Sequence, residues 1–578
     1  MLRSLNVVIA IVCAVGVSAC SKSSSSSNSG STGTGTSAAS GSTASTTSST
    51  TTTGTSATTG TSSSSTGGTT GCSAQQLNCG GTCVDSHTDP DNCGGCGVSC
   101  DGDAGLACSA GVCSSSCLTP LVVCDRACVD RGSDSANCGT CGNVCPANQG
   151  CVDGACKPAL SFDAGAGSCI AGGPPIFLGI DAGALDCAAN LAQVTFRWAL
   201  CSCSDLALSA NLQTDGFDSR FGPYSPDAGG GGGVGTDGNV QTSSTANVNG
   251  TLWAAGSQGI QTSSSITVGD ELHAGGNCSF KSVSVANDGY LAGNLNVQST
   301  STMGGTLFQQ DGGTITGPFT AASVVHEPVS IPEPCDCTNL IPISAIVAAH
   351  ATNNDNAAIG LSSSALNPPP SDLRIDLPCG SYYLDAIQAS TAITIVAHGN
   401  TALFIGGDIG VSKSLAILPD PASQLDVFVA GSINNSAELT LGSPNYPAQM
   451  RLYVQGDGAS AISLSASANL ASNIYAAAGL MHTSAPLLEY GGIIAGTYQS
   501  SASTTIHYDR AVVATGGTCS AVDAGFPSHP SDAGAQCGSC SDCGNQACIN
   551  GQCTGCQSSA DCCAPLTCNN GTCTVQFQ

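Results

Sequence analysis

The sequence predicts a mainly β protein, in which a parallel β-helix (solenoid) body is flanked by small disulfide-rich modules and a disordered Ser/Thr/Gly tether. Three observations support this class. Short alternating apolar and polar runs recur about every 20 residues between positions 159 and 515, which is typical of a solenoid. Most of the 37 cysteines lie outside that region, and only 9% of residues are charged. A β-sandwich alternates in the same way and is the alternative fold.

Residues 1–19 are expected to form a secretory signal peptide. Arg3 supplies a positive charge, and the apolar run from Leu5 to Val17 is too short for a membrane-spanning helix, which needs about 20 residues. The run ends in Val17-Ser18-Ala19-Cys20, which resembles the bacterial lipobox. The resemblance implies a diacylglycerol group on Cys20 and, with Ser21 next to it, sorting to the outer membrane. An ordinary signal peptide is the alternative.

Residues 20–71 are expected to be the lipidated cysteine followed by a flexible linker. Residues 21–71 consist almost entirely of Ser, Thr, Gly and Ala and contain no large apolar side chain. Such a segment cannot bury enough surface to offset the entropy of ordering it. It should therefore act as a tether that lifts the remaining chain away from the membrane.

Two cysteine-rich repeats are expected at 72–116 and 117–158. Their spacing recurs with a period of 45 residues, and Cys83-Val84-Asp85 matches Cys128-Val129-Asp130. Eight cysteines per repeat in an exported chain predict four disulfides, with the pairing left open. Zinc binding by C-x-x-C pairs is the alternative. The candidate disulfide cysteines are Cys72, Cys79, Cys83, Cys93, Cys96, Cys100, Cys108, Cys113, Cys117, Cys124, Cys128, Cys138, Cys141, Cys145, Cys151 and Cys156.

Each repeat has too few large apolar residues to form a core, so disulfides must substitute for one. The pattern C-V-D, then N-C-G-x-C-G-x-x-C, then C-x4-C over residues 72–156 resembles the Stig1-type cysteine-rich repeat. The resemblance implies an extracellular, non-enzymatic module.

A third cysteine-rich module is expected at 516–578. Its segment from Cys556 to Cys573 resembles a knottin-type or dickkopf-like framework. With Cys13 and Cys20 set aside, an odd number of cysteines remains, so one thiol should be free or pair with another chain. The isolated Cys519 is the candidate. The further disulfide candidates are Cys537, Cys540, Cys543, Cys548, Cys553, Cys556, Cys562, Cys563, Cys568 and Cys573.

The body, residues 159–515, contains two arrays of repeats. In the first, residues 239–257 and 259–277 align without gaps. One coil of a parallel β-helix needs about this length, so inward Val, Ile, Leu and Phe should stack on their counterparts in the next coil. The second array is marked by residues that recur at steps of 24, 25, 22 and 19, namely Phe404, Phe428, Tyr453, Tyr475 and Ile494.

Residues 339–358 interrupt the pattern between the two arrays. Ile341, Ile343, Ile346 and Val347 predict a short amphipathic helix there. Two C-x-C pairs, one at Cys201 and Cys203 and the other at Cys335 and Cys337, are expected to form disulfides that stitch the body together.

The end of the body carries three short motifs. They are Asn473-Ile474-Tyr475-Ala476, the run from Gly491 to Gly496, and Ile506-His507-Tyr508-Asp509. Together they resemble the C-terminal repeat domain of uncharacterised bacterial surface proteins, some of them attached to PilX-like pilus components. The resemblance implies a cell-envelope β-solenoid with no assigned catalytic residues.

The acidic composition and the small number of basic residues limit the classes of function that the chain can have. A formal net charge of −27, with only 12 Lys and Arg, argues against a nucleic-acid partner. Polysaccharide-cleaving β-helices need clustered carboxylates, or a carboxylate beside Arg or Lys. By contrast, we expect isolated arginines, turn aspartates and scattered histidines, which are Arg220, Arg374, Arg451, Arg510, Asp408, Asp457, His273, His482 and His507.

The expected function is that of a non-enzymatic, lipid-anchored protein of the outer membrane, exposed at the surface. It would be structural or adhesive and would bind extracellular polysaccharide or a surface protein. A carbohydrate-active β-helix enzyme and a periplasm-facing scaffold are the alternatives. No cofactor is expected, and calcium is the one ion worth considering. The calcium hypothesis rests on six Asp-Ala-Gly tripeptides, which start at Asp103, Asp163, Asp181, Asp227, Asp523 and Asp532.

Overall fold

The structure is a computed structural model of the whole chain. It describes residues 77–100, 105–162, 175–177, 185–226, 230–421, 423–456 and 460–515, together with four short strands between 547 and 574. The predicted signal peptide, Cys20 and the tether lie outside the described residues. In the part of the chain that is described, no helix is both long enough and apolar enough to cross a membrane.

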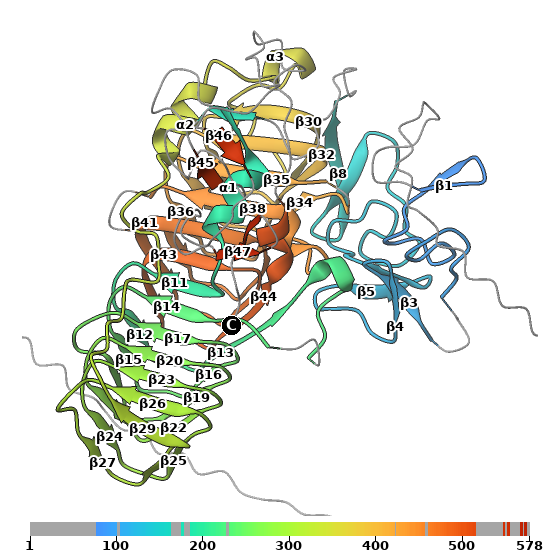
Figure 1. Cartoon of the computed structure of the whole chain (residues 1–578). Coiled ribbons are helices and arrows are strands. Elements are labelled where there is room, and N and C mark those ends of the chain that lie inside the picture. The colour runs from blue at the N-terminus through green and yellow to red at the C-terminus, as the bar shows by residue number, and fades with distance from the viewer. Residues whose placement is uncertain are drawn as a thin grey trace, which may run out of the picture. The chain divides into compact units, whose positions relative to one another are not determined.

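The first array is a parallel β-solenoid with three strands in each coil (Figure 1). Each strand pairs in parallel with the strand three places later, so that Val240 lies opposite Ile260 and Leu252 opposite Leu272. The strands are β11 (Leu200–Ser202), β12 (Leu206–Leu208), β13 (Leu212–Phe217), β14 (Val234–Thr236), β15 (Val240–Thr242), β16 (Ala246–Val248), β17 (Leu252–Ala254), β18 (Ile260–Thr262), β19 (Ser265–Val268), β20 (Leu272–Ala274), β21 (Cys278–Phe280), β22 (Ser282–Val285), β23 (Gly289–Leu291), β24 (Leu295–Val297), β25 (Ser301–Met303), β26 (Thr306–Gln309), β27 (Ile315–Thr316), β28 (Phe319–Thr320) and β29 (Ser323–His326).

The second array is also parallel, and it includes longer strands that bend around a corner of the coil. Leu403, Val427 and Leu452 stack in its interior. The strands are β30 (Leu373–Leu384), β31 (Ile387–Ala389), β32 (Ile393–Ile405), β33 (Ile409–Val411), β34 (Leu415–Pro419), β35 (Leu425–Val429), β36 (Ile433–Asn435), β37 (Leu439–Gly442), β38 (Met450–Val454), β39 (Ile462–Leu464), β40 (Ala468–Ala471), β41 (Asn473–Thr483), β42 (Leu487–Tyr490), β43 (Ile493–Ser500) and β44 (Thr504–Asp509).

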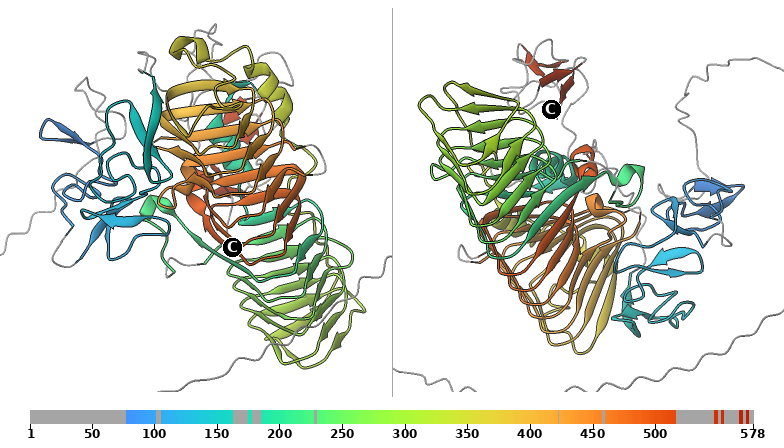
Figure 2. Two further views of the ribbon diagram at one scale, coloured as in Figure 1. Left: turned by 180° about the vertical axis from the view of Figure 1, so that it is seen from behind. Right: turned by 90° about the horizontal axis from the view of Figure 1, so that it is seen from below.

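The two arrays form one continuous solenoid, in which their order in space is the reverse of their order in sequence. The last coil of the second array pairs in parallel with the first coil of the first array, so that Ile493 lies opposite Leu200 and Thr504 opposite Leu212. Figure 2 shows the orange and red strands leading directly into the green ones. The predicted mainly β solenoid is confirmed.

Residues 327–342 (the strap) return along the outside of the first array. The strap passes the later coil before the earlier one. Trp253 Nε1 donates to the Pro332 carbonyl oxygen at 2.7 Å, and Trp198 Nε1 donates to the Pro334 carbonyl oxygen at 3.1 Å. The strap leads to two helices within the interrupted segment, α2 (Ile343–His350) and α3 (Asn356–Ile359). The other helical elements are α1 (Ala188–Thr195), η1 (Ser219–Phe221), η2 (Pro447–Gln449) and η3 (Arg510–Ala514).

The recurring aromatic residues of the second array face outward, and the prediction that its phenylalanines point inward is wrong. Phe404, Phe428 and Tyr453 stack with ring centroids 5.3 and 4.5 Å apart. They alternate with the inward leucine and valine positions of the same strands. His350 of α2 stacks on Phe404 at 3.8 Å, and Phe196, just after α1, contacts Tyr453. The row is buried because helices cover it, and not because it lines the solenoid.

The cysteine-rich repeats are built from short hairpins, and the second one is joined to the solenoid. Its last strand pairs in parallel with β30, so that Leu160 lies opposite Ile375. The strands of the small modules are β1 (Leu77–Cys79), β2 (Thr82–Val84), β3 (Ala107–Ser109), β4 (Val112–Ser114), β5 (Val122–Cys124), β6 (Ala127–Val129), β7 (Gln149–Val152), β8 (Ala155–Ser161), β45 (Ala547–Ile549), β46 (Gln552–Thr554), β47 (Thr567–Asn569) and β48 (Thr572–Thr574). A separate antiparallel pair, β9 (Pro175–Phe177) and β10 (Leu185–Cys187), precedes α1.

Candidate functional site

The second cysteine-rich repeat contains four disulfides, which join its first cysteine to its third, second to fifth, fourth to seventh and sixth to eighth. The first repeat uses the last three of these pairings, and Cys83, at the third position, is also disulfide-bonded. The bonds are Cys117–Cys128, Cys124–Cys141, Cys138–Cys151, Cys145–Cys156, Cys79–Cys96, Cys93–Cys108 and Cys100–Cys113.

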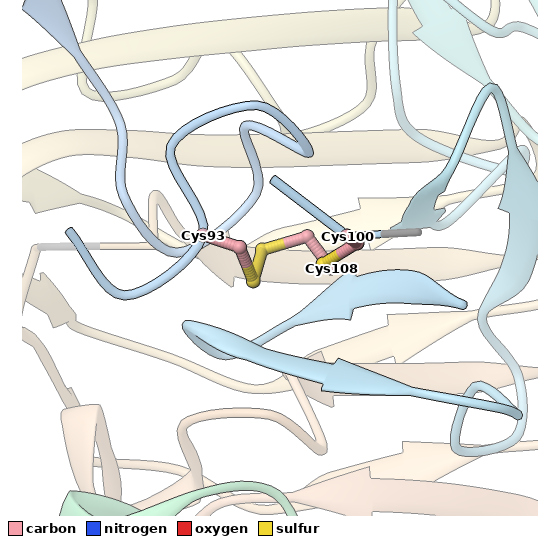
Figure 3. Close-up of side chains that lie close together, drawn as sticks. All are labelled: Cys93, Cys100 and Cys108. Atoms are coloured by element: carbon pink, nitrogen blue, oxygen red, sulfur yellow. A yellow bond between two sulfur atoms is a disulfide. The ribbon is translucent and has the colours of Figure 1, made fainter. Parts of the chain in front are cut away.

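Sulfur atoms gather closely enough in the repeats to suggest a metal site. Cys93, Cys100 and Cys108 offer sulfurs within 4.8 Å of one another (Figure 3). However, Cys93 is bonded to Cys108 and Cys100 to Cys113. Zinc binds thiolates, and a sulfur in a disulfide is not one. The chemistry of this cluster is therefore cross-linking, which replaces the missing apolar core.

Two parallel disulfides fasten the strap to the first coil. Cys201 is bonded to Cys335 and Cys203 to Cys337, each across 134 residues. Asp237 supports the same junction by accepting the Cys335 backbone N–H at 3.0 Å. Burial raises the pKa of Asp237 to about 6, and the charges of Glu333 and Asp336 add to that effect.

The remaining cysteines have varied environments. Among the described residues Cys278 is a free thiol, enclosed in the solenoid between Ile260 and Leu295, and burial raises its pKa to about 12. Cys379 is disulfide-bonded. Register pairs Cys548 with Cys553 and Cys568 with Cys573 in the C-terminal hairpins. Outside the described residues lie Cys20, Cys72, Cys519, Cys537, Cys540, Cys543, Cys556, Cys562 and Cys563.

A cleft of about 1070 Å³ lies between the cysteine-rich repeats and the adjoining coils of the second array. Three contacts fix its two walls. Ser109 Oγ donates to Asn445 Oδ1 at 2.9 Å, Arg374 Nη1 donates to the Ser133 carbonyl oxygen at 2.6 Å, and the His87 ring meets the Tyr446 ring edge-on at 5.6 Å. This cleft is the candidate site.

A chain of charged side chains runs from coil to coil along the solenoid wall of the cleft. Arg374 Nε lies 2.9 Å from Asp376 Oδ1, His398 Nε2 lies 2.9 Å from the same oxygen, and His398 Nδ1 contacts Asp420 Oδ2. Burial lowers the pKa of His398, but hydrogen bonds to Asp376 and Asp420 outweigh it and raise the pKa to about 9. His398 is therefore a cation at neutral pH.

This arrangement brings two carboxyl groups to one histidine, but it lacks the protonated acid that a glycosidase needs. A general acid needs a carboxyl group with a raised pKa. Burial raises the pKa of Asp376, but His398 and Arg374 outweigh burial and leave it lowered. Glu489 and Asp509 do have raised pKa values through burial, yet both side chains are wholly enclosed. The charged chain is suited to holding neighbouring coils together.

The arginines do not stand alone, contrary to the prediction. Arg374 pairs with Asp376 and Arg220 with Asp218, and Arg510 Nε donates to the Phe217 carbonyl oxygen at 3.3 Å. Arg451 is fully buried, and its Nε lies 2.7 Å from Asp426 Oδ1 on the neighbouring coil. These partners are 25 positions apart, about one coil. Asp376 and Asp218 lie only two positions from their arginines in the sequence, whereas the pairing of Arg451 with Asp426 depends on coil register.

The Ile506-His507-Tyr508-Asp509 motif lies where the two arrays meet. His507 Nδ1 is 2.6 Å from Asp215 Oδ1, and Tyr508 Oη donates to the Phe196 carbonyl oxygen at 2.8 Å. Asp509 accepts the backbone N–H groups of Ser219 and Ala448 at 2.9 and 3.1 Å. The motif therefore joins the second array to the first array and to the segment after α1.

The other residues singled out from the sequence are dispersed. His273 Nε2 contacts Glu271 at 2.8 Å, and Asp408 accepts the Ser432 N–H at 2.8 Å in a turn between coils. His482 lies on the outer face of β41, away from the cleft. Asp457 and the aspartates of all six Asp-Ala-Gly tripeptides lie outside the described residues.

Residues 333–515 match the family model of a domain of unknown function (DUF7305). The matched range contains the end of the strap, α2, α3 and the whole second array. No curated protein matches the chain, and no solved structure does so either. The chain therefore contains a DUF7305 domain within a β-solenoid that is preceded by disulfide-rich modules.

Proposed function

We propose that this chain is a non-enzymatic lipoprotein of the bacterial outer membrane, anchored through Cys20 and exposed at the surface, where it acts as a structural or adhesive protein. The observation that carries the proposal is the continuity of the solenoid. Two arrays that are separate in sequence stack through Ile493 and Leu200 into one body, and disulfides at Cys201 and Cys203 fasten its strap. Such a body suits a stiff spacer.

The cysteine-rich repeats suit a role as protease-resistant binding modules on that spacer. They resemble Stig1-type extracellular modules, and seven disulfides with both partners described cross-link them. Cross-links of this density protect a small domain from unfolding and proteolysis. The charge chain around His398 supports a binding role over a hydrolytic one, because His398 and Arg374 lower the pKa of Asp376, whereas a general acid needs a raised one.

Protease shaving of intact cells tests this proposal. The Ser/Thr/Gly linker should be cut first, releasing peptides from the solenoid without breaking the outer membrane. A periplasmic marker protein must remain uncut in the same samples, and a Cys20→Ser variant should be lost from the membrane fraction. Protection of the solenoid until the membrane is permeabilised would overturn surface exposure and favour a periplasmic scaffold. Depolymerisation of a polysaccharide by the purified protein would overturn the non-enzymatic role.

A further inference from the structure

A second hollow lies on a different face of the solenoid from the His398 cleft. This groove of about 700 Å³ is lined by strands of both arrays. The middle residues of β12, β15, β18 and β21 form its floor on one side of the junction, and residues near the ends of β41 and β43 form it on the other. The lining residues used below are Ala207, Gln241, Gln261, Ser279, His482 and Gln499.

These six residues form a single ladder, with one residue on each successive coil. Register places His482 opposite Gln499, Gln499 opposite Ala207, and Ala207 opposite Gln241, after which Gln261 and Ser279 follow. Neighbouring parallel strands are about 4.8 Å apart, so the ladder extends roughly 24 Å along the solenoid axis. It exists only because the two arrays stack in reversed order, since the strands that carry His482 and Gln499 belong to the second array and the other four strands to the first.

The groove is polar but carries almost no charge. Its lining contains no Lys, Arg, Asp or Glu, and His482 is its one titratable residue, in a protein with a net charge of −27. Within the described part of the chain, the side chains of Gln241 and Gln499 make no hydrogen bond and are exposed. Ala207 stands between these two amides and leaves a hollow at the centre of the ladder.

We propose that this ladder binds a neutral, linear polysaccharide lying along the solenoid axis. The coil spacing is close to the advance of one sugar unit in an extended glycan chain, so the polar side chains on either side of Ala207 can meet sugar rings in step with the coils. Glutamine amides both donate and accept, which matches sugar hydroxyl groups. Anionic polymers are disfavoured by the negative field of the whole protein. The proposal rests on the proposed adhesive function and names the class of its ligand.

Binding of the purified full chain to hexasaccharides tests this inference. The neutral probes are cellohexaose, xylohexaose and mannohexaose, and the charged control is hexagalacturonate, each measured by calorimetry. At least one neutral hexamer should bind, and hexagalacturonate should not. Gln241→Ala with Gln499→Ala should weaken binding by about tenfold or more, because each removes hydrogen bonds that are made only to the ligand. Ala207→Gln should also weaken binding by filling the hollow.

The matched control is Asn247→Ala with Thr267→Ala. Both residues are exposed, outward and central in β16 and β19, on the neighbouring face of the same coils, so these changes should leave binding unaltered. Failure of all three neutral hexamers to bind, equal binding by hexagalacturonate, or an equal loss in the control would overturn the inference. None of these results would alter where protease shaving finds the protein, and a periplasmic location would not alter binding, so the two proposals fail separately.

Discussion

His507 Nδ1 lies 2.6 Å from Asp215 Oδ1, although the two residues are 292 positions apart in the chain. Tyr224 covers the pair, since its ring stacks on His507 at 3.8 Å and its hydroxyl donates to Asp215 Oδ2 at 2.8 Å. His507 belongs to β44 and Asp215 to β13, which are neighbouring strands. The contact therefore crosses the boundary between the last coil of the second array and the first coil of the first.

Removal of this contact should destabilise the whole solenoid. His507→Ala leaves the largely buried Asp215 carboxylate with one partner fewer, which should lower the free energy of unfolding by about 1–3 kcal/mol. Chemical denaturation followed by circular dichroism measures the change. His482→Ala is the control, because His482 makes no hydrogen bond among the described residues, and its effect should be within about 0.5 kcal/mol. Equal effects of the two substitutions would contradict the structural role of the pair.

The two strap disulfides should be redundant. Each closes a loop of 134 residues, and such a loop stabilises the folded state by about 5 kcal/mol in the chain-entropy model. In the Cys201→Ser, Cys335→Ser variant the bond between Cys203 and Cys337 still closes almost the same loop. The loss in the free energy of unfolding should therefore be far smaller than about 5 kcal/mol, the value for one such loop. Removing Cys203 and Cys337 as well should produce the full loss. Thermal unfolding of the unaltered protein, the variant without one disulfide and the variant without both checks this prediction. Equal and additive losses of stability from the two disulfides would contradict it, because they would show that the bonds constrain different loops.

The buried pair of Arg451 and Asp426 should tolerate double replacement better than single replacement. Both side chains are fully enclosed, and Arg451 also donates to the Ala448 carbonyl oxygen at 3.1 Å. Arg451→Met alone strands a buried carboxylate and should cost about 3–5 kcal/mol, whereas Arg451→Met with Asp426→Leu removes both charges and should cost much less. A double variant that is less stable than the single one in denaturant titrations would be evidence against this account.

His398 should titrate near pH 9. Its pKa is raised above the ordinary value of about 6.5, so its stabilising contribution is complete below about pH 6.5 and is lost as pH rises through about 9. Carbon-13 histidine NMR, with the signal assigned by its loss in His398→Gln, measures the midpoint. Asp420→Asn should lower that midpoint, because it removes one of the two carboxylates. A midpoint at the ordinary histidine value would mean that Asp376 and Asp420 do not hold the ring.

The solenoid class follows from local sequence, because one coil returns to its starting side after about 20 residues and the apolar positions recur with it. The alignment of Val240 with Ile260 in the sequence predicts that they stack, and the two residues do lie opposite each other on neighbouring strands. The reversed order of the arrays could not be predicted, because any coil can in principle stack on any other. It depends on long-range pairing such as that of Thr504 with Leu212.

The candidate site, too, could be predicted only in part, because long-range pairing is not visible in local sequence. Cys201 and Cys335 could be predicted to stitch the body because two C-x-C pairs suggest parallel bonds. The chain from Arg374 to Asp420 was missed, since His398 lies 22 positions from both Asp376 and Asp420 and meets them only through coil register. The outward position of Phe404 was also missed, because a periodic aromatic residue looks the same in sequence whether it lines the interior or is covered by a helix such as α2.

The stacking of the second array on the first coil is the central claim, and an engineered cross-link tests it most directly. Ala207 and Gln499 are register partners on adjacent parallel strands of the two arrays and face outward, at a strand separation that suits a disulfide. Ala207→Cys with Gln499→Cys should form a new disulfide, detected by mass spectrometry of unreduced peptides. Ala207→Cys with Asn434→Cys, which lies on the same face but several coils away, should not. A cross-link in the second variant but not the first would contradict the continuous solenoid.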